Sequence, residues 1–261
     1  MDREQLIRRF ELTDRVVVVT GGTRGIGLAL AEGYVAAGAK VVIASRKADA
    51  CVEAQRHLAA LGGDALAVPT HLGDLDALDA LVETTVDRYG RLDVLVNNAA
   101  NALTQPVGQF TVDAYTKSFD VNVRGPVFLS QAALPHLIAS GHGSILNIVS
   151  AGAYLFSGDV SMYSAGKAAM VSFTKSFAAA LAPQGVRVNA MAPGPVDTDM
   201  VRNNPPEFVD ILARSTLLGR VADPDENAPS TKIPWHFWLM VIALAIYLGW
   251  RLIQGIEWLL S

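Results

Sequence analysis

The feature that most constrains the fold is the alternation of short, almost wholly apolar runs with longer helix-forming stretches over the first 195 residues. Strands that are buried on both faces of a parallel sheet have this continuous apolar character. The stretches between them are long enough for crossover helices. The pattern therefore predicts an α/β fold with a doubly wound parallel sheet and right-handed crossovers. The predicted strands are Arg15–Thr20, Lys40–Ser45, Asp64–Thr70, Leu92–Asn98, Gly143–Ser150 and Val186–Ala192.

Charge and composition exclude several classes of function. A net charge of -4 argues against a nucleic-acid partner, which would favour a basic face. The single cysteine, Cys51, allows no internal disulfide and fits a reducing compartment. The first fifteen residues are too charged for a secretory signal, so we expect the enzymatic part to stay in the cytoplasm. His57, His136 and His142 do not have the spacing of metal ligands, and no metal site is predicted.

A glycine-rich turn, TGGTRGIG, follows the first predicted strand and opens a helix. Gly21, Gly25 and Gly27 would let the backbone turn tightly and approach a pyrophosphate. The helix N-terminus behind them would supply free N–H groups and a positive dipole end. The spacing is G-x3-G-x-G, which differs from the commonest dinucleotide fingerprint, but its place after the first strand of a βαβ unit predicts nucleotide binding.

The end of the second strand indicates which dinucleotide binds. A carboxylate there would hold the ribose hydroxyls of NAD, whereas a cation favours the 2′-phosphate of NADP. This chain has Ser45 followed by Arg46, and Arg24 lies within the glycine turn. A guanidinium pairs with a phosphate in a two-pronged fork. We therefore predict NADP(H) as cofactor; the alternative is that these are two ordinary surface arginines.

Tyr163 and Lys167 are four residues apart and would share one face of a helix. An unperturbed phenol ionises near pH 10, which is too high for proton transfer at neutral pH, and an adjacent ammonium favours the phenolate. A Y-x3-K pair alone often only decorates a helix. Asn122 and Ser150, taken singly, also have ordinary structural explanations as a helix-end asparagine and a helix-cap serine.

Taken together, these motifs resemble the short-chain dehydrogenase/reductase family, including its 3-oxoacyl-carrier-protein reductases. TGGTRGIG resembles the family's cofactor turn, and NNAA at 97–100 its fourth-strand motif. FDVNVRG places Asn122 where the family has its active-site asparagine, and Ser150 precedes Tyr163 by thirteen residues, as the catalytic serine does. APGPVDT at 192–198 resembles the segment that touches the nicotinamide. The resemblance covers about Leu12 to Glu226 and implies a Rossmann-like sheet.

The resemblance implies hydride transfer between a nicotinamide and a carbonyl/alcohol pair. Tyr163 would be the acid in reduction and the base in oxidation. Lys167 would lower the pKa of Tyr163 and hold the nicotinamide ribose. Ser150 would hydrogen-bond the carbonyl oxygen. Asn122 would hold a water that links Lys167 to solvent.

Cofactor contacts are expected along the whole glycine turn and after each later strand. His71 departs from the family, which often has an aspartate there against the adenine amine; a neutral imidazole could accept a hydrogen bond or stack. The predicted contacts are Gly21, Thr23, Arg24, Gly25, Ile26, Gly27, Ser45, Arg46, His71, Leu72, Asn98, Ala99, Ala100, Tyr163, Lys167, Pro193, Gly194, Val196 and Thr198.

The resemblance stops before residue 227, where the family continues with a helix and a final strand. This chain instead has a segment from Ile233 to Trp250 without a formal charge. Its eighteen residues would span about 27 Å as a helix, close to the roughly 30 Å hydrocarbon layer of a bilayer. Aromatic residues lie near both of its ends. We therefore expect domain 1–226 to bind NADP and the tail 227–261 to anchor it to the cytoplasmic face of a membrane. A buried helix and a fused or frame-shifted terminus remain alternatives.

The sequence leaves a second functional class open, because the missing elements usually border the substrate pocket. In that alternative the chain is a non-catalytic NADP(H)-binding scaffold or sensor tethered to a membrane. For an enzyme, we expect a small-molecule carbonyl or alcohol substrate, and the apolar residues within 200–212 hint at an apolar one. The small-residue stretch 162–182 is similar to the helix that pairs in family dimers, so we expect a homodimer or higher oligomer.

Overall fold

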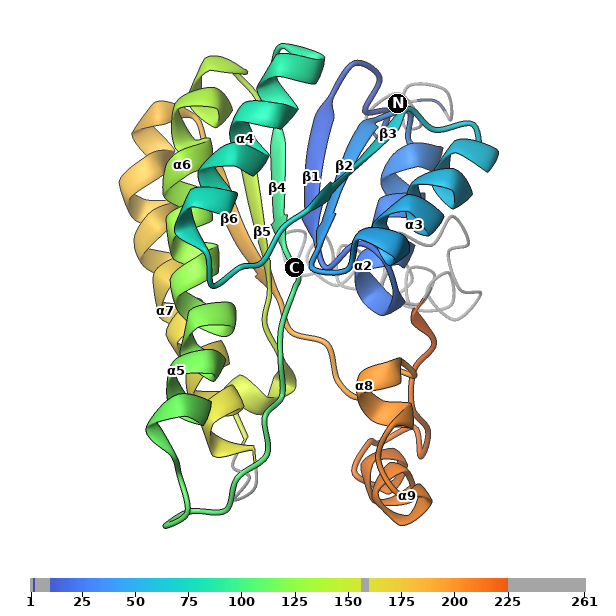
Figure 1. Cartoon of the computed structure of the whole chain (residues 1–261), viewed down its shortest axis with the longest axis vertical. Coiled ribbons are helices and arrows are strands. Elements are labelled where there is room, and N and C mark those ends of the chain that lie inside the picture. Colours follow the sequence, from blue (N-terminus) through green and yellow to red (C-terminus); the bar gives the residue numbers. More distant parts are fainter. Residues whose placement is uncertain (1, 3–9, 156–159, 225–261) are drawn as a thin grey trace, which may run out of the picture. The chain divides into compact units, whose positions relative to one another are not determined.

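The computed structural model describes residues 2, 10–155 and 160–224, all of which belong to the first of two units into which the chain divides, Met1–Ala228. Parallel strands form one sheet in the order β3-β2-β1-β4-β5-β6 (Figure 1). All six predicted strands are confirmed, with bounds within two residues of those expected. The strands are β1 (Val16–Thr20), β2 (Lys40–Ser45), β3 (Ala65–Pro69), β4 (Val94–Asn97), β5 (Ser144–Ile148) and β6 (Arg187–Met191).

Helices cover the two faces of the sheet, as the apolar strands require (Figure 1). Successive side chains of a strand point to opposite faces. Val17 and Val19 pack in one core cluster with Leu30 and Leu58, which come from α2 (Gly25–Ala36) and α3 (Ala48–Ala60). Val18, between them, packs in the cluster on the opposite face. There it meets residues of α4 (Leu75–Tyr89), α6 (Gly125–Ala139) and α7 (Ser161–Leu181). The doubly wound fold is therefore confirmed.

Strand order decides where a ligand can bind. The chain winds outward from β1 to β3 and then crosses to β4 on the other side of β1. In such sheets ligands bind beyond the carboxyl ends of the strands at this reversal of direction. The shorter elements lie in the connections: α5 (Val112–Phe119), the π-helical turn η1 (Asp120–Arg124), η2 (Ala151–Ala153), η3 (Ala182–Gln184), α8 (Asp199–Arg202) and α9 (Pro206–Arg214).

The C-terminal segment predicted to anchor the chain, including the helix at 233–250 that would replace a final strand, lies outside the described residues. Within the described ranges, no helix has both the length and the apolar character needed to span a bilayer. The described part of the sheet ends at β6.

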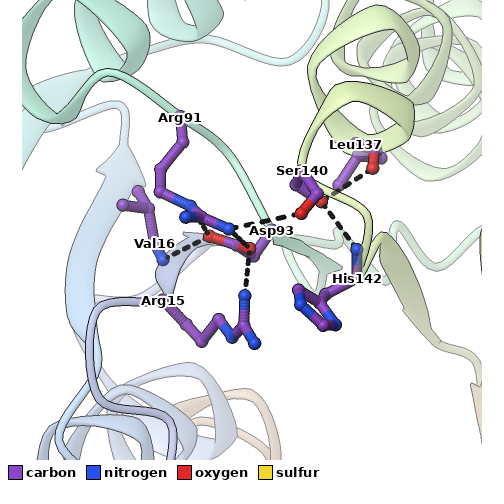
Figure 2. A network of polar contacts seen from close by, with 7 residues as sticks. All are labelled: Arg15, Val16, Arg91, Asp93, Leu137, Ser140 and His142. Carbon is purple, nitrogen blue, oxygen red and sulfur yellow. Dashed lines mark hydrogen bonds and ion pairs between the residues drawn. The ribbon is translucent and has the colours of Figure 1, made fainter.

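A buried carboxylate links β1 to the segment before β4 at the amino ends of these strands (Figure 2). Asp93, just before β4, is 1% exposed. Its carboxylate accepts bonds from the Val16 N–H at 3.0 Å and from Arg91 Nε and Nη2 at 2.8 and 2.6 Å. Arg15 Nη1 lies 3.3 Å away. Burial by itself would raise the pKa of Asp93, but the hydrogen bonds from Arg91 and Val16 outweigh it, and the pKa lies below its ordinary value.

Asp93→Asn should lower the free energy of unfolding at pH 7 by about 2 kcal/mol, because it removes one partner of a largely buried, charge-assisted network. The depressed pKa means that the carboxylate stabilises the fold above about pH 4 and loses this effect as the pH falls through the folded-state pKa. The difference between wild type and variant in urea unfolding should therefore shrink in acid. Asp113→Asn, which removes an exposed partner of Lys117, is the matched control and should change stability by less than about 0.5 kcal/mol. Equal losses for both variants would contradict this account.

Candidate active site

The glycine turn lies where the sequence predicts, between β1 and α2, and its glycines are required by close contacts. A Cβ on Gly27 would lie 2.2 Å from the carbonyl oxygen of Gly21. Gly25 has a φ of +53°, which disfavours other residues. Arg24 is the N-cap of α2 without a capping side chain, and the first turn holds no acidic residue. The N-terminus of α2 is therefore suited to a phosphate.

Thr20, which the sequence analysis did not single out, joins this turn to the segment after β4. Its hydroxyl accepts the N–H groups of Asn98 and Ala99 at 3.0 and 3.1 Å. The Asn98 side chain donates back to the carbonyl of Thr20 at 2.9 Å. These bonds hold the predicted cofactor segment at 98–100 beside the glycine turn. The sequence signal for this role is the position of Thr20 directly before the first two glycines of the turn.

The carboxyl ends of β2 and β3 meet the turn on its other side. Thr23 Oγ1 donates to Ser45 Oγ at 3.2 Å, and the Thr70 N–H donates to the carbonyl of Ser45 at 2.9 Å. Arg46 is exposed beside them. Arg24 is exposed but paired, because its Nη1 is 3.0 Å from a carboxylate oxygen of Asp199. Sequence reasoning missed Asp199, which is 175 positions away.

His71 and Leu72 follow β3, and their contacts limit how each residue can bind a cofactor. His71 Nδ1 accepts the N–H of Gly73 at 3.0 Å. A neutral ring in this arrangement carries its proton on Nε2, which makes the free nitrogen a donor. To accept a hydrogen bond from an adenine amine, as expected, His71 would have to lose the hydrogen bond that it accepts from Gly73. Stacking of the imidazole ring on the adenine would leave that bond intact. Leu72 is buried in the core beneath α6, so its backbone is the part that can reach a ligand.

Ser150 and Tyr163 come together as predicted. Ser150 directly follows Val149 at the end of β5 and caps η2, with its Oγ accepting the N–H of Gly152 at 3.1 Å. The next N–H, that of Ala151, donates to the carbonyl of Pro193 at 2.9 Å, which ties this loop to the segment after β6. Tyr163, near the start of α7, lies close enough to Ser150 for the serine hydroxyl to lower its pKa. The two side chains therefore lie close together beyond the carboxyl end of β5.

Lys167 lies one helical turn beyond Tyr163 and is almost fully buried, at 4% exposure. Its Nζ donates to the carbonyl of Ile148 at 2.7 Å and lies 5.6 Å from the centroid of the Tyr163 ring. Burial lowers the pKa of Lys167 to about 8.

The pKa of Tyr163 departs from expectation. Burial raises the pKa of Tyr163, and the hydrogen bond from Ser150 offsets only part of the rise. The net direction is the opposite of the lowering expected from Lys167. The physical reason is that Tyr163 is itself largely buried, and the cost of desolvating a phenolate outweighs the stabilisation that Ser150 supplies.

Asn122 lies in the π-helical turn that joins α5 to α6, and such turns are frequent at functional sites. It is 1% exposed. Its Nδ2 donates to the carbonyl of Asn101 at 2.9 Å, and its Oδ1 accepts the N–H of Asn101 at 3.1 Å. Gly166 lets α7 approach, because a Cβ there would lie 3.3 Å from Asn122 Cβ. Asn122 thus packs against the residue that precedes Lys167, while its partner Asn101 was missed by sequence reasoning.

The segment after β6 completes the edge of the site. Val196 is buried, and its strand-like bridge to Ala222 fixes the start of the connection that carries α8 and α9. Thr198 lies against the glycine turn, where a Cβ on Gly25 would be 2.9 Å from Thr198 Cγ2. Nothing lies within 4 Å of a Cβ built on Gly194, so the backbone there is open. The predicted residues after β1, β5 and β6 thus lie along one edge of the sheet, with direct contacts between these segments.

Comparisons with known proteins agree with the α/β fold described above. The sequence model described as short chain dehydrogenase matches residues 15–207. The chain is 37% identical to galactitol 2-dehydrogenase of Agrobacterium fabrum over 82% of this chain and 88% of that enzyme. It is 36% identical to 3-oxoacyl-[acyl-carrier-protein] reductase of Synechocystis, over 83% of this chain and 87% of the reductase. Among solved structures, a short chain dehydrogenase from Burkholderia cenocepacia in complex with NADP superposes with a TM-score of 0.77 at 32% identity, covering 84% of this chain and 89% of the other.

Proposed function

The chain belongs to the short-chain dehydrogenase/reductase family of oxidoreductases, and on that premise we propose that it is an NADPH-dependent enzyme that interconverts a carbonyl and an alcohol. The observation that carries the proposal is the proximity of Ser150 to Tyr163, with the buried Lys167 one helical turn away and 5.6 Å from the centroid of the Tyr163 ring. This arrangement supplies an oxygen-binding donor, a proton donor and a cation at one place. The proposed catalytic residues are Asn122, Ser150, Tyr163 and Lys167.

The bound nicotinamide would supply the hydride; the chain's own residues would hold the substrate oxygen and move one proton. Ser150 would donate a hydrogen bond to the carbonyl oxygen, on which negative charge develops. Tyr163 would donate its hydroxyl proton to that oxygen, so that the carbonyl gains one hydride and one proton and becomes an alcohol. The raised pKa keeps Tyr163 protonated at neutral pH, which is the state that reduction needs. Protonated Lys167 would stabilise the phenolate that is left.

The residues present fit a dinucleotide phosphate. The uncapped N-terminus of α2 would hold the pyrophosphate, and Arg46 together with Arg24 would bind the 2′-phosphate. The end of β2 has Ser45 and Arg46 where a carboxylate would favour NAD. The NADP complex of a relative supports this choice. Thr198 and the backbone of Gly194 would border the nicotinamide end.

Exposed apolar side chains around the same edge of the sheet favour an apolar substrate over a polyol. They come from the connections that follow β4, β5 and β6. Large apolar groups that lack cover in the free protein are typical of binding surfaces. The side chains are Val107, Phe110, Tyr154, Leu155, Met200, Phe208, Ile211, Leu217 and Leu218. Of the two relatives described above, the 3-oxoacyl-[acyl-carrier-protein] reductase fits this surface better than the galactitol dehydrogenase.

The test is NADPH oxidation by the full chain, kept in mild detergent, on a panel of aliphatic ketones, 3-oxoacyl thioesters and ketoses. We expect turnover with NADPH and a preference for the acyl and aliphatic carbonyls. Binding of NADPH without turnover on any carbonyl would contradict an enzymatic role and favour the non-catalytic scaffold.

We also propose that the boundary near 226 separates the catalytic domain from a tail that holds the enzyme on a membrane. The uncharged run from Ile233 to Trp250 supports this. Full-length protein should sediment with membranes and resist extraction by high salt, whereas a chain ending at Glu226 should not sediment. Release of the full chain by salt alone would contradict an anchoring tail.

Pairing of two copies through α7 is proposed as well. Small residues on α7, among them Ala165 and Ala168, are exposed and would allow close approach of a second helix. Sedimentation equilibrium in detergent should give at least a dimer, and Ala168→Arg should shift it toward the monomer. A wild-type monomer at micromolar concentration would contradict this.

A further inference from the structure

An ion pair joins the glycine turn to the segment after β6. Arg24 Nη1 lies 3.0 Å from Asp199 Oδ2, although the two residues are 175 positions apart. The pair is accessible to solvent, with Arg24 68% and Asp199 49% exposed. Thr198, directly before Asp199, packs on Gly25, directly after Arg24. Two neighbouring contacts therefore fix Asp199 opposite the guanidinium.

The position of Asp199 is set by its own segment as well. The connection between Pro195 and Ala222 is closed at its base, since the N–H of Asp197 donates to the carbonyl of Ala222 at 2.8 Å and the N–H of Ala222 to that of Pro195 at 2.9 Å. Asp197 forms a two-pronged pair with Arg202 at 2.7 and 2.8 Å. Arg202 is thus already engaged by Asp197, and Asp199 is paired with Arg24.

Arg24 can pair with either of two anions, the Asp199 carboxylate or a phosphate of the bound dinucleotide. Under the proposed function its guanidinium binds the 2′-phosphate of the dinucleotide, and a guanidinium engaged by a carboxylate is less able to form the same fork with a phosphate. An exposed ion pair contributes little free energy, so a phosphate can displace the Asp199 carboxylate from Arg24. The displaced Asp199 would then remain near the phosphate as a repulsive charge.

From these contacts we infer that Asp199 is a positioning residue that sets cofactor preference: it competes with the 2′-phosphate for Arg24 and thereby weakens NADPH binding relative to NADH. The inference rests on the proposed NADP site. Asp199 touches neither the reacting atoms nor the substrate oxygen in this account, and it acts through Arg24.

The test compares equilibrium dissociation constants for NADPH and NADH, measured by calorimetry in wild type and in Asp199→Asn. Asparagine keeps the size of the side chain and removes its charge. We expect the Kd for NADPH to fall about two- to fivefold, the range of an exposed ion pair, and the Kd for NADH to stay unchanged. The gain should shrink in high salt. It should vanish in an Arg24→Ala background, as a double-mutant cycle requires if the effect passes through Arg24.

Asp197→Asn is the matched control, because it removes the same charge two residues away without touching Arg24. An unchanged NADPH-to-NADH ratio in Asp199→Asn would overturn the inference, as would an equal shift in Asp197→Asn. Wild-type protein that bound NADH but no NADPH would instead overturn the proposed NADP site. The inferred competition between Asp199 and the 2′-phosphate would then fall as well.

Discussion

Tyr163→Phe is expected to lower the rate of NADPH-dependent carbonyl reduction by about 10²- to 10⁴-fold, the range that general acid catalysis contributes. The variant keeps the ring, its packing near the start of α7 and its 5.6 Å approach to Lys167 Nζ. It loses the one proton that the substrate oxygen needs. The loss should appear in kcat, because the hydroxyl is used in the transition state more than in substrate binding.

The comparison needs a control that removes a phenol hydroxyl elsewhere. Tyr115→Phe serves, since Tyr115 lies on α5, stacks on Phe119 and is half exposed. That variant should keep the full rate. The Kd for NADPH and the melting temperature of Tyr163→Phe should match wild type, so that lost activity is not lost folding. A Tyr163→Phe protein with the wild-type rate would reject the assigned acid.

Lys167→Met should have opposite effects on activity and stability. Activity should fall by about 10²-fold or more, because no cation remains to stabilise the phenolate. The free energy of unfolding at pH 7 should rise by about 1–2 kcal/mol, because methionine fills a similar volume without burying an ammonium. The lost bond from Lys167 to the Ile148 carbonyl offsets part of the gain.

The pH dependence of this gain follows from the pKa of about 8 for buried Lys167, against about 10.4 in an unfolded chain. Between these values the unfolded wild-type chain holds a proton that the folded protein lacks, so raising the pH stabilises the fold. The cost of burying the charge is complete below pH 8 and disappears by about pH 10.5. The stability advantage of Lys167→Met, measured by urea unfolding, should therefore shrink across this window. A constant advantage from pH 7 to pH 10.5 would contradict a buried, pKa-lowered lysine.

The strands were predictable because their chemistry is local. A run such as Val16–Val19 must be buried on both faces, and the structure shows all four of these valines almost fully buried. The glycine turn was likewise predictable from its place after the first strand. The pairing of Ser150 with Tyr163 was expected from the family resemblance and not from sheet geometry.

Other features depend on three-dimensional contacts that no local pattern encodes. The pair between Arg24 and Asp199 joins residues 175 positions apart. The hydrogen bond from the Gly73 N–H to His71 Nδ1, which leaves Nε2 as the free donor, depends on the loop after β3. The pKa of Lys167 depends on its depth beneath β5, which the Y-x3-K spacing does not reveal. The tail at 227–261 lies outside the described residues, so its membrane role stays a prediction.

Transfer of isotope from cofactor to product tests the central claim most directly. NADPH with deuterium at both C4 positions would be supplied to the full chain with the carbonyl that it reduces fastest, and the alcohol analysed by mass spectrometry. Hydride transfer at the Ser150–Tyr163–Lys167 site predicts one deuterium on the carbinol carbon of every product molecule. An alcohol without deuterium, or no alcohol while NADPH stays bound, would contradict the account.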